Sequence, residues 1–217
     1  MQRLLVFASG TADSGGSGFK NLVIRSRGDN PDLEADIVGV VSQYEAGGVR
    51  SHAEDLGIPF FYFPGPYTAA DYQRLVMETG ADWVALSGWL KKTVGLDPDR
   101  TINIHPGPLP RFGGKGMYGH HVHEAVLAAY QAGEITHTGV TMHFVTEEFD
   151  AGPRFFWAEY EIGPNDDAGD ICARVNMLEH YWQPRITNEV IRRRIRWDGK
   201  DPDSLYVEPC LRVYLPR

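Results

Sequence analysis

The chain alternates short apolar runs with amphipathic segments. The apolar runs have the length of buried strands and lie at residues 4–8, 36–42, 59–63 and 83–87. The segments between them have the spacing of helices and lie at 19–27, 49–56 and 67–80. This alternation predicts an α/β domain built around a mostly parallel sheet.

The regular alternation of apolar runs and amphipathic segments ends near residue 100, and the connecting loops become longer after it. The predicted elements are a strand at 102–105, a Pro- and Gly-rich loop at 106–119, a helix at 121–132, strands at 138–145 and 155–162, and a helix at 170–194. Pro184 lies inside the last helix and predicts an interruption or a kink there.

Neither a repeat nor a linker divides the chain. We therefore expect one Rossmann-like, doubly wound domain over residues 1–197, with a mostly parallel sheet and helices on both faces. The C-terminal tail, 198–217, is polar and contains proline, and we expect it to pack on this domain or to fray.

The 217 residues carry 21 Lys and Arg against 29 Asp and Glu, which gives a formal net charge of −8. This charge argues against the binding of nucleic acid or of an anionic membrane. The basic run at 192–194, with Arg196, lies near the end of a predicted helix and complements the carbonyl end of the helix dipole. We favour this interpretation over an RNA contact.

Cys172 and Cys210 lie far apart and indicate neither a disulfide framework nor a zinc ribbon. The N-terminal apolar run is too short for a secretory signal, and no apolar stretch long enough for a transmembrane helix follows. We therefore expect a cytoplasmic protein.

The glycine-rich loop after the first strand is a candidate anion site. The loop runs from Gly10 to Gly18 and precedes a predicted helix, so the backbone N–H groups of Gly16, Ser17 and Gly18 can favour a phosphate. It lacks both the Lys-Ser/Thr ending of a nucleotide P-loop and the glycine spacing of a dinucleotide motif. A turn without a ligand is the alternative.

Asn103 and His105 are the first candidates for catalysis. They stand two residues apart on a predicted strand, so they face the same side where the strand ends and a doubly wound sheet binds its ligands. An Asn amide can donate to an oxyanion, and a His can transfer a proton. A purely structural histidine is the alternative.

Asp150 lies in the turn that follows another predicted strand. Its carboxylate can orient an imidazole, hold a proton-relaying water and raise the pKa of a histidine toward neutral pH. An Asx turn is the alternative. His121 and His123 suggest a metal ligand pair, but no matching cysteine or carboxylate spacing accompanies them, and we expect no metal.

The same residues carry a resemblance to a known family. Asn103-Ile104-His105-Pro106, Leu109-Pro110, the strand 139–145 and Asp150-Ala151-Gly152-Pro153 resemble, in this order, the motifs of the formyltransferases. The resemblance extends over about residues 4–191, and the segment 113–119 resembles one bacterial branch of the family. It implies the formyltransferase fold and the transfer of a formyl group from 10-formyltetrahydrofolate to the amine of 5-phosphoribosylglycinamide (GAR) in purine biosynthesis.

The resemblance also implies roles for individual residues. Asn103 would stabilise the oxyanion, His105 would donate a proton, and Asp150 would position His105 and a relay water. The residues matching the contacts to the phosphate, the ribose hydroxyls and the glycinamide are Gly16, Ser17, Gly18, Glu179, Gly88 and Pro106. The residues expected against the folate are Leu90, Lys91, Lys92, Thr93, Thr146, Glu147, Glu148 and Phe149.

Two segments depart from the usual family pattern. The phosphate loop has extra residues after Gly10 and carries Gly18 where Asn is common, and Leu90-Lys91 replaces the more usual Met-Arg. Neither change affects Asn103 or the other two polar residues of the expected chemistry.

Other functions fit parts of the pattern. A sugar-nucleotide N-formyltransferase needs only a changed amine pocket. A catalytically silent module that binds folate or senses a phosphorylated metabolite is the alternative from a different class. A methionyl-tRNA formyltransferase would share the Asn-x-His and Asp residues, but enzymes of that kind have a longer chain with a C-terminal barrel that binds tRNA. The sequence is compatible with a monomer or a homodimer.

Overall fold

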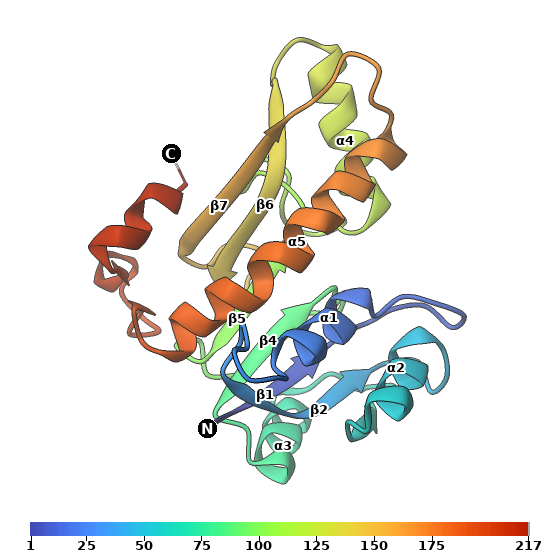
Figure 1. Cartoon of the computed structure of the whole chain (residues 1–217), viewed down its shortest axis with the longest axis vertical. Coiled ribbons are helices and arrows are strands. Elements are labelled where there is room, and N and C mark those ends of the chain that lie inside the picture. Colours follow the sequence, from blue (N-terminus) through green and yellow to red (C-terminus); the bar gives the residue numbers. More distant parts are fainter. Residues whose placement is uncertain (217) are drawn as a thin grey trace.

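A seven-stranded sheet in the order β3-β2-β1-β4-β5-β6-β7 runs through the computed structural model, which describes residues 1–216 (Figure 1). The strands of this sheet are β1 (Gln2–Phe7), β2 (Ala35–Ser42), β3 (Phe60–Tyr62), β4 (Trp83–Ser87), β5 (Thr101–His105), β6 (His137–Phe144) and β7 (Arg154–Glu161). The α-helices are α1 (Ser17–Arg25), α2 (Gly48–Leu56), α3 (Ala69–Thr79), α4 (His120–Gln131) and α5 (Ala168–Ile191).

The strand directions divide the sheet into two halves. The strands from β3 to β5 pair in parallel, whereas β6 is antiparallel to both β5 and β7. The chain first winds outward from β1 to β3 and then returns to place β4 on the other side of β1. Ligands of doubly wound sheets bind at such a reversal, beyond the carboxyl ends of the strands. The predicted doubly wound, mostly parallel fold is confirmed.

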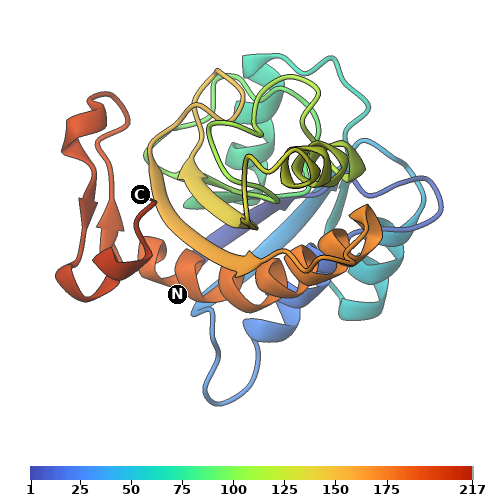
Figure 2. The same cartoon turned by 90° about the horizontal axis from the view of Figure 1, so that it is seen from above.

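Helices cover both faces of the sheet, because the side chains of each buried strand alternate between two cores. On β1, Leu4 and Val6 pack with apolar side chains of α1, α2, α4 and α5, whereas Leu5 and Phe7 pack with those of α3. Figure 2, seen from above, shows the long helix α5 lying along the sheet.

Helix α5 is continuous through Pro184, so the helix is not interrupted there, and a kink at this residue stays a prediction. A proline cannot donate to the carbonyl four residues earlier, which here belongs to His180. The side-chain amide of Asn21 on α1 donates to that carbonyl oxygen over 2.6 Å. The neighbouring helix therefore satisfies the group that Pro184 leaves without its usual partner.

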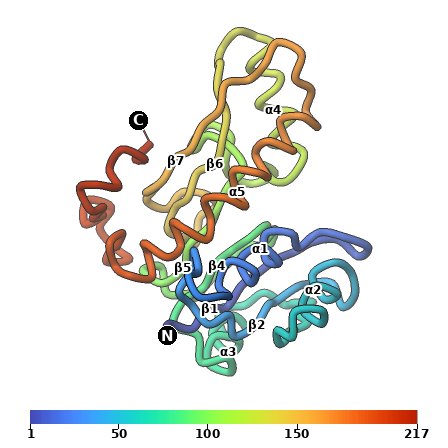
Figure 3. The backbone as a smooth tube through the Cα atoms, in the orientation of Figure 1, coloured from blue at the N-terminus to red at the C-terminus, as the bar shows by residue number. Residues whose placement is uncertain are grey.

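The C-terminal segment, red in Figure 3, folds beside β7. Two short strands, β8 (Ile195–Arg196) and β9 (Tyr206–Val207), pair with each other. One 3-10 helix, Pro202–Ser204, lies between them, and a second, Pro209–Tyr214, follows β9. The Tyr214 ring packs against Phe156 of β7 and Trp182 of α5.

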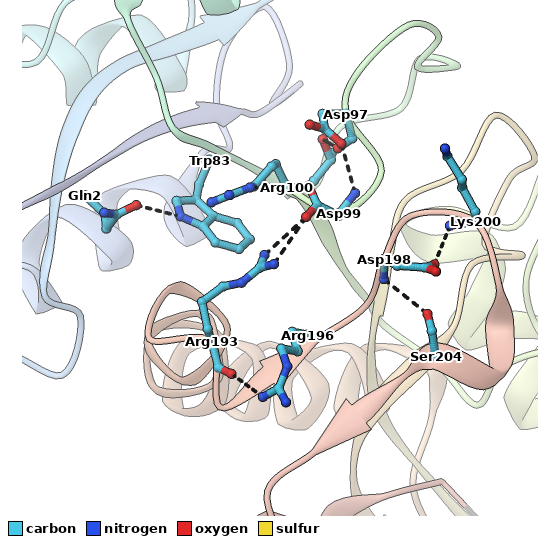
Figure 4. Close-up of polar contacts among 11 residues, drawn as sticks. Gln2, Trp83, Asp97, Asp99, Arg100, Arg193, Arg196, Asp198, Lys200 and Ser204 are labelled. Atoms are coloured by element: carbon cyan, nitrogen blue, oxygen red, sulfur yellow. Dashed lines mark hydrogen bonds and ion pairs between the residues drawn. The ribbon is translucent and has the colours of Figure 1, made fainter.

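Ion pairs occupy the basic run at the end of α5. Arg192 pairs with Glu34, and Arg194 pairs with Glu208. Figure 4 shows the guanidinium of Arg193 directed at Asp99, with its two terminal nitrogens 3.3 and 3.4 Å from one carboxylate oxygen. Helix α5 ends at Ile191 with no basic residue in its last turn, so the run follows the helix and is not part of it as predicted. The contact of Arg193 joins the segment after α5 to the loop that precedes β5.

Within residues 1–216, no helix combines the length and the apolar character that crossing a bilayer requires.

Candidate active site

A cavity of about 630 Å³ opens at the carboxyl ends of the central strands. Its walls come from the loops after β1, β4 and β5, from the glycine-rich segment that precedes α4, and from α5. Every residue predicted to contact GAR, and all three predicted catalytic residues, line this one cavity. The cavity thus lies where the strand order predicts a ligand site.

The anion loop, residues 10–18, ends at the start of α1. Gly16 is the N-cap and has a φ of 82°, a left-handed conformation that favours glycine, and no side chain caps the helix. Gly18 lies so close to Ser87 that a Cβ at residue 18 would approach the Ser87 Oγ to 2.3 Å. The loop therefore presents uncapped N–H groups of the first turn at the cavity, which suits an anion.

Helix α5 forms the opposite wall. Asn176 and Glu179 line the cavity one turn apart, and burial raises the pKa of the Glu179 carboxyl to about 7. The next turn is tied to the sheet by Gln183, which accepts from the Ser87 hydroxyl over 3.0 Å and donates to the Leu86 carbonyl over 3.2 Å. This wall places carboxylate and amide groups opposite the anion loop.

A polar cluster of Asn103, His105, His143 and Asp150 lies where β5 and β6 meet. The antiparallel register places Asn103 directly opposite His143. The Asn103 Nδ2 lies 3.1 Å from the His143 Nε2. The Asp150 Oδ1 lies 3.7 Å from the His105 Nδ1 and 3.5 Å from the His143 Nε2. Both imidazoles are buried and face the same carboxylate oxygen.

The hydrogen bonds of His105 fix its tautomer. Its Nε2 lies 2.8 Å from the carbonyl oxygen of Phe112, which can only accept, so Nε2 carries the hydrogen. In the neutral ring, Nδ1 is then a free acceptor on the side of Asp150. Burial lowers the pKa of His105 from its ordinary 6.5 and outweighs the opposing charge of Asp150. Asp150 thus acts on this pKa in the expected direction, but burial has the larger effect, and the pKa of His105 lies below its ordinary value.

Asp150 is held in an unusual conformation. Its φ is 53°, a left-handed value that few residues other than glycine, Asn and Asp adopt. The Oδ2 accepts from the backbone N–H of Gly114 over 2.9 Å, which connects the turn to the glycine-rich segment 113–119. Burial raises the pKa of Asp150, but contacts with His143, His105 and Gly114 together outweigh it and hold the pKa below its usual value. Asp150 is therefore ionised at neutral pH, and the Gly114 N–H donates to it.

A second, smaller cavity opens on the other side of the polar cluster. Lys91, Lys92 and Thr93 line it from the loop after β4, and residues 146–149 line it from the loop after β6. Asn103 and Asp150 line both cavities, whereas Leu90 faces the larger one. All residues predicted to contact folate therefore lie around the polar cluster.

Three residues of this region have no predicted role in catalysis or in contacts with GAR or folate, although the sequence suggests His123 as one of a metal ligand pair. His143 joins the polar cluster, and Lys115 is the only Lys or Arg among the described residues that line the larger cavity. His123 is buried at the wall of this cavity, and its Nδ1 has no partner in residues 1–216. Burial lowers the pKa of His123 to about 4. The alternation of side chains along β6 indicates which face of the sheet His143 lies on. Only the register of β6 with β5 places it beside Asn103.

No three His, Cys, Asp or Glu side chains within residues 1–216 are arranged to hold a metal ion. His121 is exposed and lies near Glu124, whereas His123 is buried. The two histidines of the suggested ligand pair therefore occupy different environments.

Comparisons with known proteins extend this description. The model of the formyl transferase family matches residues 2–187. The chain is 32% identical to the chloroplastic phosphoribosylglycinamide formyltransferase of Arabidopsis thaliana, over 94% of this chain and 74% of that protein. It is 30% identical to phosphoribosylglycinamide formyltransferase of Bacillus subtilis, over 88% and 95%.

Solved structures show the same relationship. The crystal structure of phosphoribosylglycinamide formyltransferase from Anaplasma phagocytophilum has a TM-score of 0.75 and 26% identity, and the match covers 95% of this chain and 98% of that one. Together with the family model and the curated relatives, this similarity shows that the chain belongs to the formyl transferase family.

Proposed function

We propose that this protein transfers a formyl group from 10-formyltetrahydrofolate to the amine of GAR, giving formyl-GAR and tetrahydrofolate, in purine biosynthesis. The observation that carries the proposal is that Asn103 and Asp150 line both cavities. The larger cavity contains the anion loop, and the smaller one contains the loops predicted to contact folate. A phosphorylated amine on one side and a formyl donor on the other would meet at the polar cluster. Relatives that carry this activity by name support the substrates.

The chemistry begins with attack of the neutral amine on the formyl carbon. A new C–N bond forms, and the carbonyl oxygen becomes an oxyanion to which the Asn103 amide donates. The amine must lose one proton, and the free Nδ1 of His105 is positioned to accept it. Asp150 then stabilises the imidazolium, because its Oδ1 lies 3.7 Å from Nδ1.

The intermediate collapses when the bond between the formyl carbon and N10 of the folate breaks. N10 needs one proton, and the His105 imidazolium or a water held by Asp150 supplies the proton that the amine released. Protons and electrons therefore balance without a redox partner, and the transfer as written uses no metal.

The anion loop and α5 would bind GAR at its other end. The N–H groups of Gly16, Ser17 and Gly18 would hold the phosphate, and Glu179 would accept from the ribose hydroxyls. Gly88 and Pro106 would line the path of the glycinamide. The folate would lie against Leu90 and the loops of the smaller cavity.

An acceptor panel tests the proposal. The protein is incubated with 10-formyltetrahydrofolate and either GAR or an amino-sugar nucleotide, and tetrahydrofolate formation is followed by absorbance, with the His105→Ala variant as control. We expect turnover with GAR in the wild type and little or no turnover in the His105→Ala variant. Turnover with the amino sugar alone would identify a sugar-nucleotide N-formyltransferase, and folate binding without any turnover would identify a binding module. Activity in a cytoplasmic fraction would test the predicted location.

A further inference from the structure

His143 is the member of the polar cluster to which the proposed chemistry assigns no step. Its side chain is only 2% exposed, and it stands directly opposite Asn103 in the pairing of β5 with β6. It contacts the proposed oxyanion donor and lines the smaller cavity assigned to the formyl donor, but not the larger cavity assigned to GAR.

One nitrogen of the His143 ring is committed to the backbone. Its Nδ1 lies 2.8 Å from the carbonyl oxygen of Phe144. A carbonyl oxygen can only accept, so Nδ1 carries a hydrogen. In the neutral ring, the Nε2 then has a lone pair, and this lone pair accepts from the Asn103 Nδ2 over 3.1 Å.

This contact decides which way the Asn103 amide faces. If the amide turned over, its Oδ1 would face the lone pair of Nε2, and two acceptors would meet. The observed orientation commits one N–H to His143 and leaves the second N–H of the same amide for an oxyanion. We propose that His143 is a positioning residue that, through this fixed tautomer, holds the Asn103 amide with its free N–H available to the reacting oxygen. This inference rests on the proposed formyl transfer.

The backbone around His143 is shaped to keep the Phe144 carbonyl in place. The pairing of β6 with β7 shifts register between Met142 and His143, a bulge of the kind that redirects side chains beside active sites. The Phe144 N–H donates to Pro153, and a Cβ on Gly152 would meet the Phe144 carbonyl oxygen at 1.8 Å. Only glycine at residue 152 allows this close approach.

The charged neighbour of the ring does not replace Asn103. Asp150 Oδ1 lies 3.5 Å from Nε2, farther than the Asn103 amide. The carboxylate makes a shorter contact with the backbone, because its Oδ2 accepts from the Gly114 N–H over 2.9 Å. A proton on Nε2 would direct His143 at Asp150 instead and release the Asn103 amide.

The tautomer can be observed directly in the substrate-free protein. Nitrogen-15 spectra of histidine-labelled protein at pH 8 distinguish a protonated ring nitrogen from an unprotonated one, and the signals missing in a His143→Gln sample assign the ring. We expect Nδ1 of His143 to be protonated and Nε2 to be unprotonated. Protonation of both nitrogens, or of Nε2 alone, would overturn the inference. This measurement does not depend on the acceptor substrate.

Kinetics test whether the contact matters. His143→Asn preserves a donor to Phe144 but cannot reach Asn103, whereas the longer His143→Gln can place an oxygen near the former Nε2 position. We expect His143→Asn to lower kcat about 10- to 100-fold with KM for GAR changed by less than about 3-fold, and His143→Gln to recover part of the loss. A loss confined to KM, or equal losses in both variants, would contradict a positioning role.

A double-mutant cycle with Asn103→Ala separates this role from a merely structural one. If His143 acts through Asn103, adding His143→Asn to Asn103→Ala lowers kcat by less than about 2-fold. If the fold-loss of kcat in the double variant equals the product of the fold-losses in the two single variants, the inference is overturned. Should GAR support no turnover at all, the proposed function fails, while the tautomer measurement still decides the orientation of the amide.

Discussion

The two halves of the sheet supply the site with different kinds of groups. The parallel half offers the anion loop, an exposed glycine-rich segment whose working groups are backbone N–H donors. The junction of β5 with the antiparallel strand β6 offers side chains in a fixed register around Asp150, namely the half-buried Asn103 and the buried His105 and His143. Backbone donors are independent of residue type but sensitive to added volume, whereas the side-chain cluster depends on the chemical identity of each member.

This difference has a consequence for mutation. Substitutions in the polar cluster should reduce the rate of the chemical step, and substitutions in the anion loop should reduce substrate affinity. A loop variant that acts on kcat alone, or a cluster variant that acts on KM alone, would break the comparison.

The largest effect is expected in the polar cluster. His105→Ala and Asp150→Asn should each lower kcat by about 100-fold or more, because they remove the proton acceptor and the charge that stabilises its protonated form. The exposed His121→Ala, on α4, is the matched control and should retain the wild-type rate. Steady-state kinetics with circular dichroism to verify folding give the answer, and an unchanged rate in either cluster variant would remove that residue from the mechanism.

A smaller effect, on binding, is expected in the anion loop. Gly18→Ala places a Cβ against Ser87 Oγ and should raise KM for GAR about 10- to 100-fold, since the loss of charge-assisted hydrogen bonds costs about 1.5–3 kcal/mol. Ser87→Ala removes the clashing oxygen and should restore much of the affinity in the double variant. If Ser87→Ala fails to rescue, the clash is not the cause of the loss.

The pH dependence of kcat sharpens the description of the cluster. Because burial lowers the pKa of His105 below 6.5, its Nδ1 stays a free acceptor down to pH values below 6.5, and kcat at saturating substrates should fall only there. The charge of Asp150 opposes this lowering, so Asp150→Asn should move the fall to still lower pH. A fall already present near pH 7.5 would contradict the dominance of burial.

The smallest effect is expected in stability, at Glu179 on the binding wall. Its pKa in the folded protein is raised from 4.5 to about 7, so the folded state binds more protons than the unfolded state in this range, and stability declines as pH rises through it. Glu179→Gln cannot ionise and should gain on the order of 1 kcal/mol over wild type at pH 8 relative to pH 5. Urea unfolding at both pH values measures this difference, and an equal difference at the two pH values would refute it.

Much of the parallel half could be predicted from the sequence, because its strands are short apolar runs and its helices have regular spacing. The helix predicted from residue 19 begins at Ser17, since the glycine-rich loop gives no apolar signal for its end. The break predicted at Pro184 is absent, because a side chain from a distant helix, Asn21, bonds the affected carbonyl. A single sequence does not show such a partner.

Only part of the site could be predicted, because some of its contacts also join residues far apart in the chain. Asn103 and His105 share a strand face through their spacing alone, Asp150 is a candidate from its turn after a predicted strand, and the resemblance to formyltransferases implies a common role for the three. The contact of Asn103 with His143 depends on the antiparallel register of two strands about 40 residues apart, and the pKa of His105 depends on how deeply the ring is buried. Neither property follows from residue type or local spacing.

The central claim is that the anion loop binds the phosphate and the polar cluster performs the transfer. The measurement that tests it most directly compares kcat/KM for GAR and for its dephosphorylated nucleoside in the wild type, Gly18→Ala and His105→Ala. We expect the wild type to prefer GAR by about 10- to 100-fold, Gly18→Ala to lose most of this preference, and His105→Ala to keep it while losing rate with both substrates. A preference that is the same in the wild type and Gly18→Ala would contradict the account.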